Sequence, residues 1–281
     1  MLGLGGGAAP VYHRRTIIRP PGIARLARLS FADQIRDIDL VVFDKDGTLI
    51  DFDFTWSQRC LRSVDALIAE RPARAAERDR LLRTIGIDPL TAKSLPESPV
   101  VVGSLAEVVT VCATVLHQAG EPWTTATMAA EAHVRPILGA PPRLDEVRTI
   151  GDVAGLFARL RDAGVAVGVL TNDDRAGTVA TLFNLGLLPL VSAIVCADDQ
   201  HGAKPDPGGL LHLAAHAGVP LGRVALVGDA IGDLVTARRA GAAIGIGVLS
   251  GAARRADLEP HADAILDDIG AIAILADPAI A

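Results

Sequence analysis

The fold is decided by the stretch IDLVVFDKDGT, residues 38–48. Its first part, residues 38–43, is an almost continuous apolar run that ends directly before Asp44. Such a run is typical of a strand that is buried on both faces, as in a parallel sheet covered by helices. We therefore expect a parallel α/β protein in which an acidic loop follows the first core strand.

Four further apolar runs repeat this pattern, at residues 165–170, 194–196, 224–227 and 243–248. Predicted helices alternate with these runs, at residues 152–163, 175–185, 208–217 and 233–240, and a glycine suited to a helix C-terminal cap follows each of them closely. Strands and helices that alternate in this way predict an α/β core with a Rossmann-like, doubly wound parallel sheet.

One interval is too long for this alternation. About 100 residues separate the first strand from the helix at residue 152, whereas a parallel crossover needs only a dozen or more. Apolar residues recur at helical spacing inside the interval, and Ser104 with Glu107 forms a capping box before one such helix. We therefore predict a core of residues 38–51 and 148–281, and an inserted, all-helical cap of residues 52–147.

Residues 1–37 have a different composition, with a glycine run, three prolines and five arginines before the first acid at Asp33. The pattern GxGxxA occurs there, but no predicted strand precedes it, as a dinucleotide-binding loop would require. An organellar transit peptide would be similarly rich in arginine and poor in acids, although serine is scarce here. The prediction that we favour is a loosely ordered, basic extension.

Composition excludes several classes of protein. Half of the 281 residues are hydrophobic, which argues against disorder, and the net charge of −6 gives no attraction to nucleic acid or to an anionic membrane. No apolar run is long enough to span a bilayer. The three cysteines are odd in number and far apart, which indicates buried thiols in a reducing compartment and hence a cytoplasmic protein.

Polar residues end the predicted strands, and ligands of parallel sheets bind beyond those ends. They are Asp44, Asp46 and Thr48 after the first strand, where Gly47 allows a sharp turn, Thr171 and Asn172 after the second, Asp229 and Asp233 after the fourth, and Lys204 between the last two groups. Four carboxylates in one crevice repel one another unless a cation lies among them, and Mg²⁺ with oxygen ligands meets that need. Together with a hydroxyl and an ammonium group, they are suited to phosphoryl transfer.

Each group taken singly has an ordinary structural interpretation. A DxDGT segment can be a simple turn, Thr-Asn after a strand favours turns, and the acids of GDxxxD can stabilise a helix start through its dipole. Their order and their common placement at strand ends favour a joint functional interpretation.

The sequence resembles the haloacid dehalogenase superfamily of hydrolases, closest in layout to the phosphoglycolate phosphatase-like members with a helical cap. The resemblance covers roughly residues 38–269 and includes all four family motifs. It implies that Asp44 is the nucleophile that forms an aspartyl-phosphate, and that Asp46 is a general acid and then a base. The implied phosphate-binding residues are Gly47, Thr171, Asn172 and Lys204, and the implied Mg²⁺ ligands are Asp44, the Asp46 carbonyl, Asp229 and Asp233.

The second aspartate of the pair, Asp46, favours phosphate esters, because the dehalogenase and phosphonate-cleaving branches lack an acid there. It does not separate a phosphatase from a phosphosugar mutase of the same superfamily. A binding or regulatory module with negligible turnover is a further alternative, although all four motifs are intact. The resemblance implies a small phosphorylated metabolite as the substrate, for which phosphoglycolate, sugar phosphates, phosphoserine and nucleotides all stay open.

Some secondary expectations concern the cap. Phe52, Phe54 and Trp56 follow the nucleophile loop and either line the substrate entrance or pack the hinge. Residues 95–104 are the cap loop expected to reach the active site, where Lys93 or Arg59 could meet an anionic group of the substrate. If strand alternation continues past residue 43, Lys45 points away from the two catalytic acids.

Overall fold

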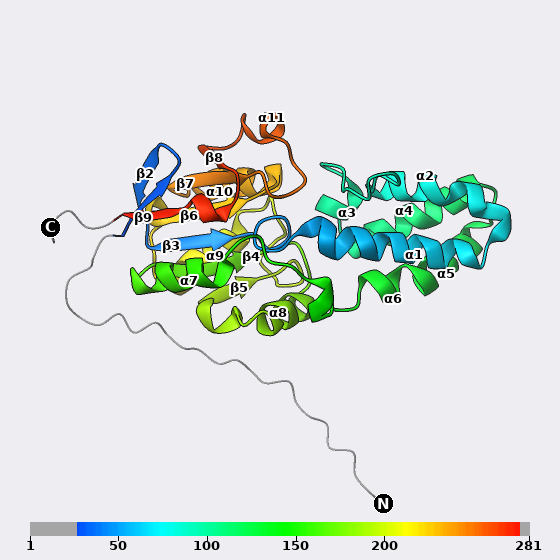
Figure 1. The fold of residues 1–281 in the computed structure, drawn as a ribbon, viewed down its shortest axis with the longest axis horizontal. Coiled ribbons are helices and arrows are strands. Elements are labelled where there is room, and N and C mark those ends of the chain that lie inside the picture. Colours follow the sequence, from blue (N-terminus) through cyan, green and yellow to red (C-terminus); the bar gives the residue numbers. More distant parts are fainter. Residues whose placement is uncertain (1–26, 276–281) are drawn as a thin grey trace, which may run out of the picture.

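The computed structural model describes residues 27–275, and its centre is a six-stranded parallel sheet in the order β5-β4-β3-β6-β7-β8 (Figure 1). The strands are β3 (Leu40–Phe43), β4 (Ala166–Leu170), β5 (Ala193–Val195), β6 (Val224–Gly228), β7 (Ile244–Val248) and β8 (Ala264–Leu266). This arrangement confirms the predicted α/β class and the doubly wound sheet. Of the strands in this sheet, only the edge strand β8, which has just three residues, was not predicted.

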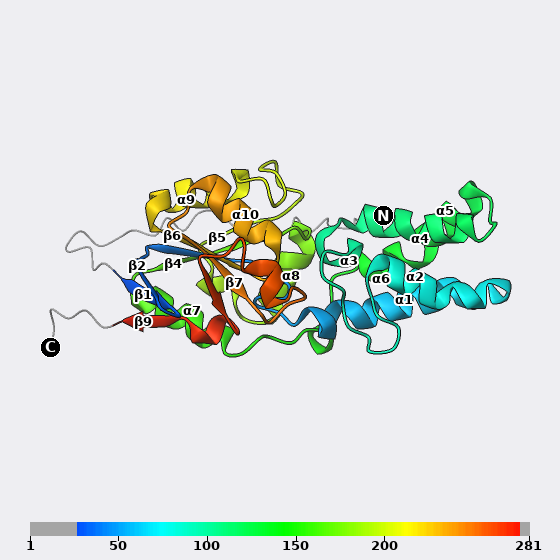
Figure 2. The same ribbon diagram turned by 90° about the horizontal axis from the view of Figure 1, so that it is seen from above.

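Helices cover both faces of the sheet, as Figure 2 shows for α7 on one side and for α9 and α10 on the other. The core helices are α7 (Val153–Asp162), α8 (Arg175–Asn184), α9 (Gly208–Ala217), α10 (Ile231–Ala240) and the short α11 (Arg255–Leu258). In β3, Val41 and Phe43 pack into the cluster that includes α7, whereas Leu40 and Val42 pack into the cluster that includes α9 and α10. Burial on both faces explains why this strand is apolar throughout.

A second, three-stranded antiparallel sheet corrects the predicted boundary at residue 37. Its strands are β1 (Arg28–Phe31), β2 (Gln34–Asp37) and β9 (Ala273–Leu275), in the order β2-β1-β9. Leu29 and Phe31 are fully buried in the main core, so residues 28–37 belong to the folded unit instead of a loose extension. The polar strand β2 has no apolar alternation that could have revealed it. The glycine and proline motifs of residues 1–26 lie outside the described residues.

The long interval after β3 forms a separate group of helices, which lie at the right of Figure 1 and extend away from the sheet. They are α1 (Gln58–Ala69), α2 (Arg78–Ile85), α3 (Pro99–Val102), α4 (Leu105–Gln118), α5 (Trp123–His133) and α6 (Arg135–Leu138). They enclose a hydrophobic cluster of their own, with Leu67, Leu81 and Leu116 fully buried. The predicted capping box of Ser104 and Glu107 is present at the start of α4.

The two chain segments that join these helices to the sheet lie side by side. The Asp51 amide donates to the Arg148 carbonyl over 2.8 Å, and the two side chains form an ion pair of 2.5 Å. Ile50 and Thr149 form an isolated antiparallel bridge next to them. Because both connections meet at this point, we propose that the cap is the unit of residues 52–147.

Two further sequence expectations can be compared with the described residues. Cys60, Cys112 and Cys196 are buried and form no disulfide, as their spacing indicated. Between residues 27 and 275, none of the helices has both the length and the apolar character that crossing a membrane requires.

Candidate active site

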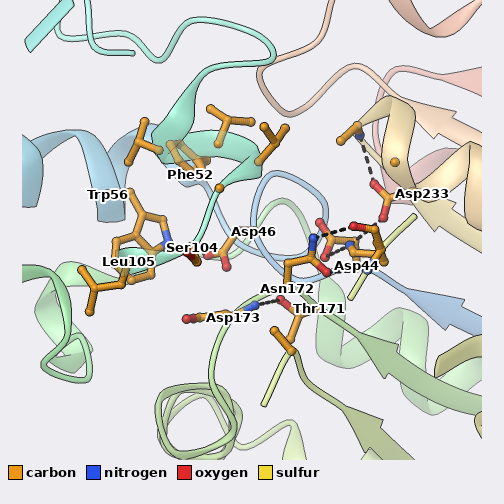
Figure 3. A pocket seen from close by; sticks show the side chains of 18 of the residues that line it. Asp44, Asp46, Phe52, Trp56, Ser104, Leu105, Thr171, Asn172, Asp173 and Asp233 are labelled. Carbon is orange, nitrogen blue, oxygen red and sulfur yellow. Dashed lines mark hydrogen bonds and ion pairs between the residues drawn. The ribbon is translucent and has the colours of Figure 1, made fainter. Parts of the chain in front are cut away.

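Three neighbouring strands bring the candidate residues together. β3 lies between β4 and β6, and Phe43 is in register with Val169 of β4 and Val227 of β6. Asp44, Thr171 and Asp229 follow these three strands and therefore meet at the carboxyl edge of the sheet. They line a pocket of about 760 Å³ between the sheet and the cap helices, shown in Figure 3.

Three carboxylates form a compact cluster at the base of this pocket. Oxygens of Asp44, Asp229 and Asp233 all lie within 4.8 Å of one another, and the three residues are buried. Burial raises the pKa of Asp44, against the opposing effect of the nearby Lys204 ammonium. Burial, reinforced by the charges of Asp44 and Asp233, raises the pKa of Asp229 well above its usual range. When its three carboxylates are ionised, the cluster carries more negative charge than the single ammonium of Lys204 neutralises.

Lys204 is the cation of this cluster. Its Nζ donates to Asp44 Oδ1 and to Asp233 Oδ1, both at 2.6 Å. Burial alone would lower the pKa of Lys204, but the two carboxylates outweigh that effect and raise it, so the ammonium stays charged. The Asn172 side chain holds the lysine in place, because it accepts from the Lys204 amide over 2.8 Å and donates to the Lys204 carbonyl over 3.0 Å.

Two glycines make room for Asp229, and sequence analysis singled out only the first. Gly47 adopts a positive φ of 82°, and a Cβ there would lie 2.4 Å from Asp229 Oδ2. A Cβ at Gly251 would lie 1.8 Å from the same oxygen. Thr48 Oγ1 and the Ala252 amide donate to the two Asp229 oxygens, over 3.2 and 3.3 Å. Gly251 lies in a loop after β7 with no recognisable motif, so no local signal could have identified it.

Lys45 contradicts the expectation that it points away from the acids. Its Nζ lies 2.5 Å from Asp46 Oδ2 and 3.0 Å from Asp173 Oδ2, and its side chain is almost fully buried. Strand alternation fails because β3 ends at Phe43 and a turn begins immediately, in which the Leu49 and Ile50 amides donate to the Lys45 carbonyl. The turn directs the ammonium back onto Asp46.

Asp46 has a second partner from the cap side. Trp56 Nε1 donates to Asp46 Oδ1 over 2.8 Å, from a π-helix at Asp53–Ser57 that leads into α1. Burial raises the pKa of Asp46, although Lys45 lowers it. Figure 3 shows Asp46 between Trp56 on the cap side and Asp44 on the sheet side.

Some of the aromatic residues after the nucleophile loop, and the predicted cap loop, reach the pocket. Phe52 and Trp56 line the pocket, whereas Phe54 lies outside it, with its ring 4.6 Å from the Arg148 guanidinium carbon. The cap loop of residues 95–104 does reach the active site, through Glu97, α3 and Ser104.

Arg59 and Lys93, either of which could have met an anionic group of the substrate, do not line the pocket. Arg59 is buried in the cap, where its guanidinium donates to Glu146 Oε2 over 3.0 Å and to backbone carbonyls. Lys93 is exposed and pairs with Asp53 at 3.0 Å. Both partners are acids that the local sequence pattern did not connect with these cations.

Comparison with known proteins gives a consistent family. Residues 38–241 match the model of the haloacid dehalogenase-like hydrolases. A phosphoglycolate phosphatase of Agrobacterium fabrum is 28% identical over 233 residues, which cover 83% of this chain and 90% of the relative. A phosphoglycolate phosphatase of Neisseria meningitidis is 28% identical over 219 residues, which cover 77% of this chain and 83% of the relative.

Solved structures share the fold. A haloacid dehalogenase-superfamily hydrolase of Geobacter sulfurreducens superposes with a TM-score of 0.55 at 19% identity, covering 82% of this chain and 92% of that one. A haloacid dehalogenase-like family protein of Streptococcus pneumoniae gives a TM-score of 0.55 at 14% identity, with 82% and 94% covered. At these identities the likeness concerns the fold alone, whereas the family model covers most of the sequence. The chain belongs to the haloacid dehalogenase-like hydrolases.

Proposed function

We propose that this hydrolase is a Mg²⁺-dependent phosphatase, which cleaves the phosphate monoester of a small metabolite through an aspartyl-phosphate on Asp44. The observation that carries the proposal is the bridge of Lys204 Nζ to Asp44 and Asp233, at 2.6 Å each, inside the pocket that Asp46 and Thr171 also line. The naming of several curated relatives as phosphoglycolate phosphatases supports a monoester as the substrate class.

The chemistry of the donor set fits a magnesium ion. Asp44, Asp229 and Asp233 offer carboxylate oxygens within 4.8 Å of one another, and hard oxygen ligands are those that Mg²⁺ prefers. Lys204 supplies a single positive charge to these three carboxylates, and burial raises the pKa values of Asp44 and Asp229. Together with the Asp46 carbonyl, these three residues would hold the ion, which would offset the negative charge of the carboxylates and the phosphoryl group.

In the first half of the proposed reaction, a carboxylate oxygen of Asp44 attacks phosphorus while the bond to the leaving oxygen breaks. Asp46 gives a proton to that oxygen. Burial raises the pKa of this carboxyl, against the opposing effect of Lys45. Lys204 and the Thr171 hydroxyl stabilise the charge of the phosphoryl oxygens. The products are the free alcohol and an aspartyl-phosphate on Asp44.

In the second half, Asp46 is a carboxylate and takes a proton from water. The resulting hydroxide attacks phosphorus, the bond to Asp44 breaks, and inorganic phosphate leaves. The buried Lys45 and the Trp56 indole fix the Asp46 side chain, so the same group can give and then take the proton at one position.

The first experiment measures phosphate release from 4-nitrophenyl phosphate with and without Mg²⁺. We expect activity that requires the metal and that disappears in Asp44→Asn. The matched control Asp162→Asn changes an exposed aspartate at the end of α7 and should keep full activity. Activity that persists in Asp44→Asn, or that ignores chelation of the metal, would overturn the mechanism.

A second measurement separates the phosphatase from its alternatives. Acid quenching during turnover, followed by mass spectrometry of the intact protein, should reveal one added phosphoryl group that Asp44→Asn lacks. A binding module with negligible turnover would show neither this adduct nor phosphate release. A mutase would move phosphate within a sugar and release little of it.

A further inference from the structure

The cap presents an apolar wall to the proposed active site. The wall consists of Val100, Val101 and Val102 of α3, Leu105 and Val108 of α4, and Leu138 of α6, all of which line the pocket. Val102 is 42% exposed although it is apolar. In Figure 3, the labelled Leu105 lies on the cap side with Trp56 and Ser104, opposite Asp44 and Thr171.

The charges in the pocket are almost all negative. Among its lining residues, all of which are described, Lys204 is the one cation, and it already contacts two carboxylates at 2.6 Å. Glu97 adds a negative charge on the cap side, and Asp173, Asp174 and Asp198 line the sheet side. Lys45 does not itself line the pocket, but it pairs with two of the pocket's acids, Asp46 and Asp173. Lys93 and Arg59 pair with Asp53 and Glu146, which lie outside the pocket lining.

The apolar wall on one side and the charged residues on the other determine where each part of a substrate can lie. The phosphoryl group must approach Asp44 and Lys204 for the proposed chemistry, so the alcohol part extends towards the cap wall. A carboxylate on that part would lose water against valine and leucine side chains without gaining a cation, and it would meet the negative charge of Glu97 on the cap side. An uncharged hydrocarbon part would instead bury apolar surface against the same wall.

On the basis of the proposed phosphatase function, we infer that this site prefers phosphate monoesters whose alcohol part is uncharged and apolar, and that it discriminates against alcohols that carry a carboxylate. Phosphoglycolate, the substrate in the names of the relatives, belongs to the disfavoured class. Residues of α3 and of the first turns of α4 determine this selectivity, since they supply most of the wall.

The test compares benzyl phosphate with 4-carboxybenzyl phosphate, which share the same reacting centre and differ in one remote charge. We expect kcat/KM to be at least about tenfold higher for benzyl phosphate, the order by which one unmatched group changes selectivity in a pocket. Phosphoglycolate should be a poorer substrate than ethyl phosphate for the same reason. Equal rates, or a preference for the carboxylated member of either pair, would overturn the inference.

4-Nitrophenyl phosphate distinguishes this failure from failure of the proposed function. If it is hydrolysed and the carboxylated esters are preferred, the phosphatase stands and the selectivity is refuted. If no phosphate ester is hydrolysed, the proposed function is refuted, and the selectivity is refuted with it.

A charge placed in the wall provides a second, independent readout. Val101 lines the pocket and is only partly buried, so Val101→Lys should fold and supply the missing cation. We expect it to lower KM for 4-carboxybenzyl phosphate and to shift the preference towards that ester by about tenfold or more. The control Thr110→Lys adds the same charge on an exposed part of α4 outside the pocket and should leave the preference unchanged.

Thermal unfolding of both variants shows whether the cap is intact. If Val101→Lys is folded and its preference equals that of Thr110→Lys, the apolar wall does not set the selectivity. If Val101→Lys is unfolded, Val101→Arg and Val102→Lys serve the same purpose, and an unchanged preference in a folded one refutes the inference.

Discussion

Lys45 offers a sharp test of how the site is held together, through the substitution Lys45→Met. The Lys45 side chain is 2% exposed and pairs with Asp46 at 2.5 Å and with Asp173 at 3.0 Å. Methionine has a similar length but no charge, so the variant keeps the packing and leaves two carboxylates without their cation.

The magnitude follows from burial. Removal of one partner from a buried ion pair costs about 3–5 kcal/mol, because the remaining charge stays desolvated. The side chains of Asp46 and Asp173 are 16% and 20% exposed, so water relieves part of the penalty and the lower end applies. We expect a loss of about 3 kcal/mol in the free energy of unfolding. For a chain of this size the loss corresponds to a fall of roughly 6–12 °C in Tm.

The measurement is urea and thermal unfolding followed by circular dichroism, without metal, for four proteins: wild type, Lys45→Met, Asp173→Asn and the double variant. The double variant should be more stable than Lys45→Met alone, because it removes one of the two uncompensated carboxylates. A loss below about 1 kcal/mol in Lys45→Met, or strict additivity in the double variant, would refute the assigned role of this buried ion pair.

Three further predictions concern single contacts. Trp56→Phe removes the hydrogen bond from the indole to Asp46, so kcat for an alkyl phosphate should fall about tenfold. The fall should be smaller for 4-nitrophenyl phosphate, because its leaving group needs no proton. An equal loss on both substrates would contradict this role of Trp56. Gly251→Ala places a Cβ against Asp229, so the Mg²⁺ concentration for half-maximal activity should rise about tenfold. An unchanged Mg²⁺ titration of the activity would contradict the importance of that contact. Asp199→Asn breaks an ion pair that lowers the pKa of this carboxyl, so it should cost about 1 kcal/mol at neutral pH. That difference should vanish as the pH falls through the lowered pKa of Asp199. Denaturant unfolding at several pH values measures it, and a deficit that persists in acid would contradict this role of the ion pair.

Much of the core was predictable because burial on both faces leaves a direct mark in the sequence. The apolar run before Asp44 became β3, and the run before Thr171 became β4, with ends that differ by no more than two residues. The small strands β1 and β2 left no such mark, because β2 is exposed and mostly polar. The place of β1 in the fold depends on pairing with β9 at the opposite end of the described chain, and β2 pairs with β1.

In the candidate site, too, some residues could be predicted from the sequence and others could not. Sequence order and strand ends brought Asp44, Asp229 and Lys204 into one hypothesis, and the structure places them in contact or close to it. The interpretation of Lys45 was wrong, because the chain turns directly after β3 and alternation no longer holds. Gly251 was missed, because its role is to leave room for a side chain from a different strand.

Hydrophobic patterning in the sequence located five of the six strands of the main sheet and the polar residues that follow them, since such patterning is a local property of the chain. The tertiary structure alone decided which charges pair and which stay free to face a substrate. Arg59, for example, is bound to Glu146 inside the cap and is thereby removed from the pocket. An ion pair depends on what lies across the space between two segments, and no local pattern contains that information.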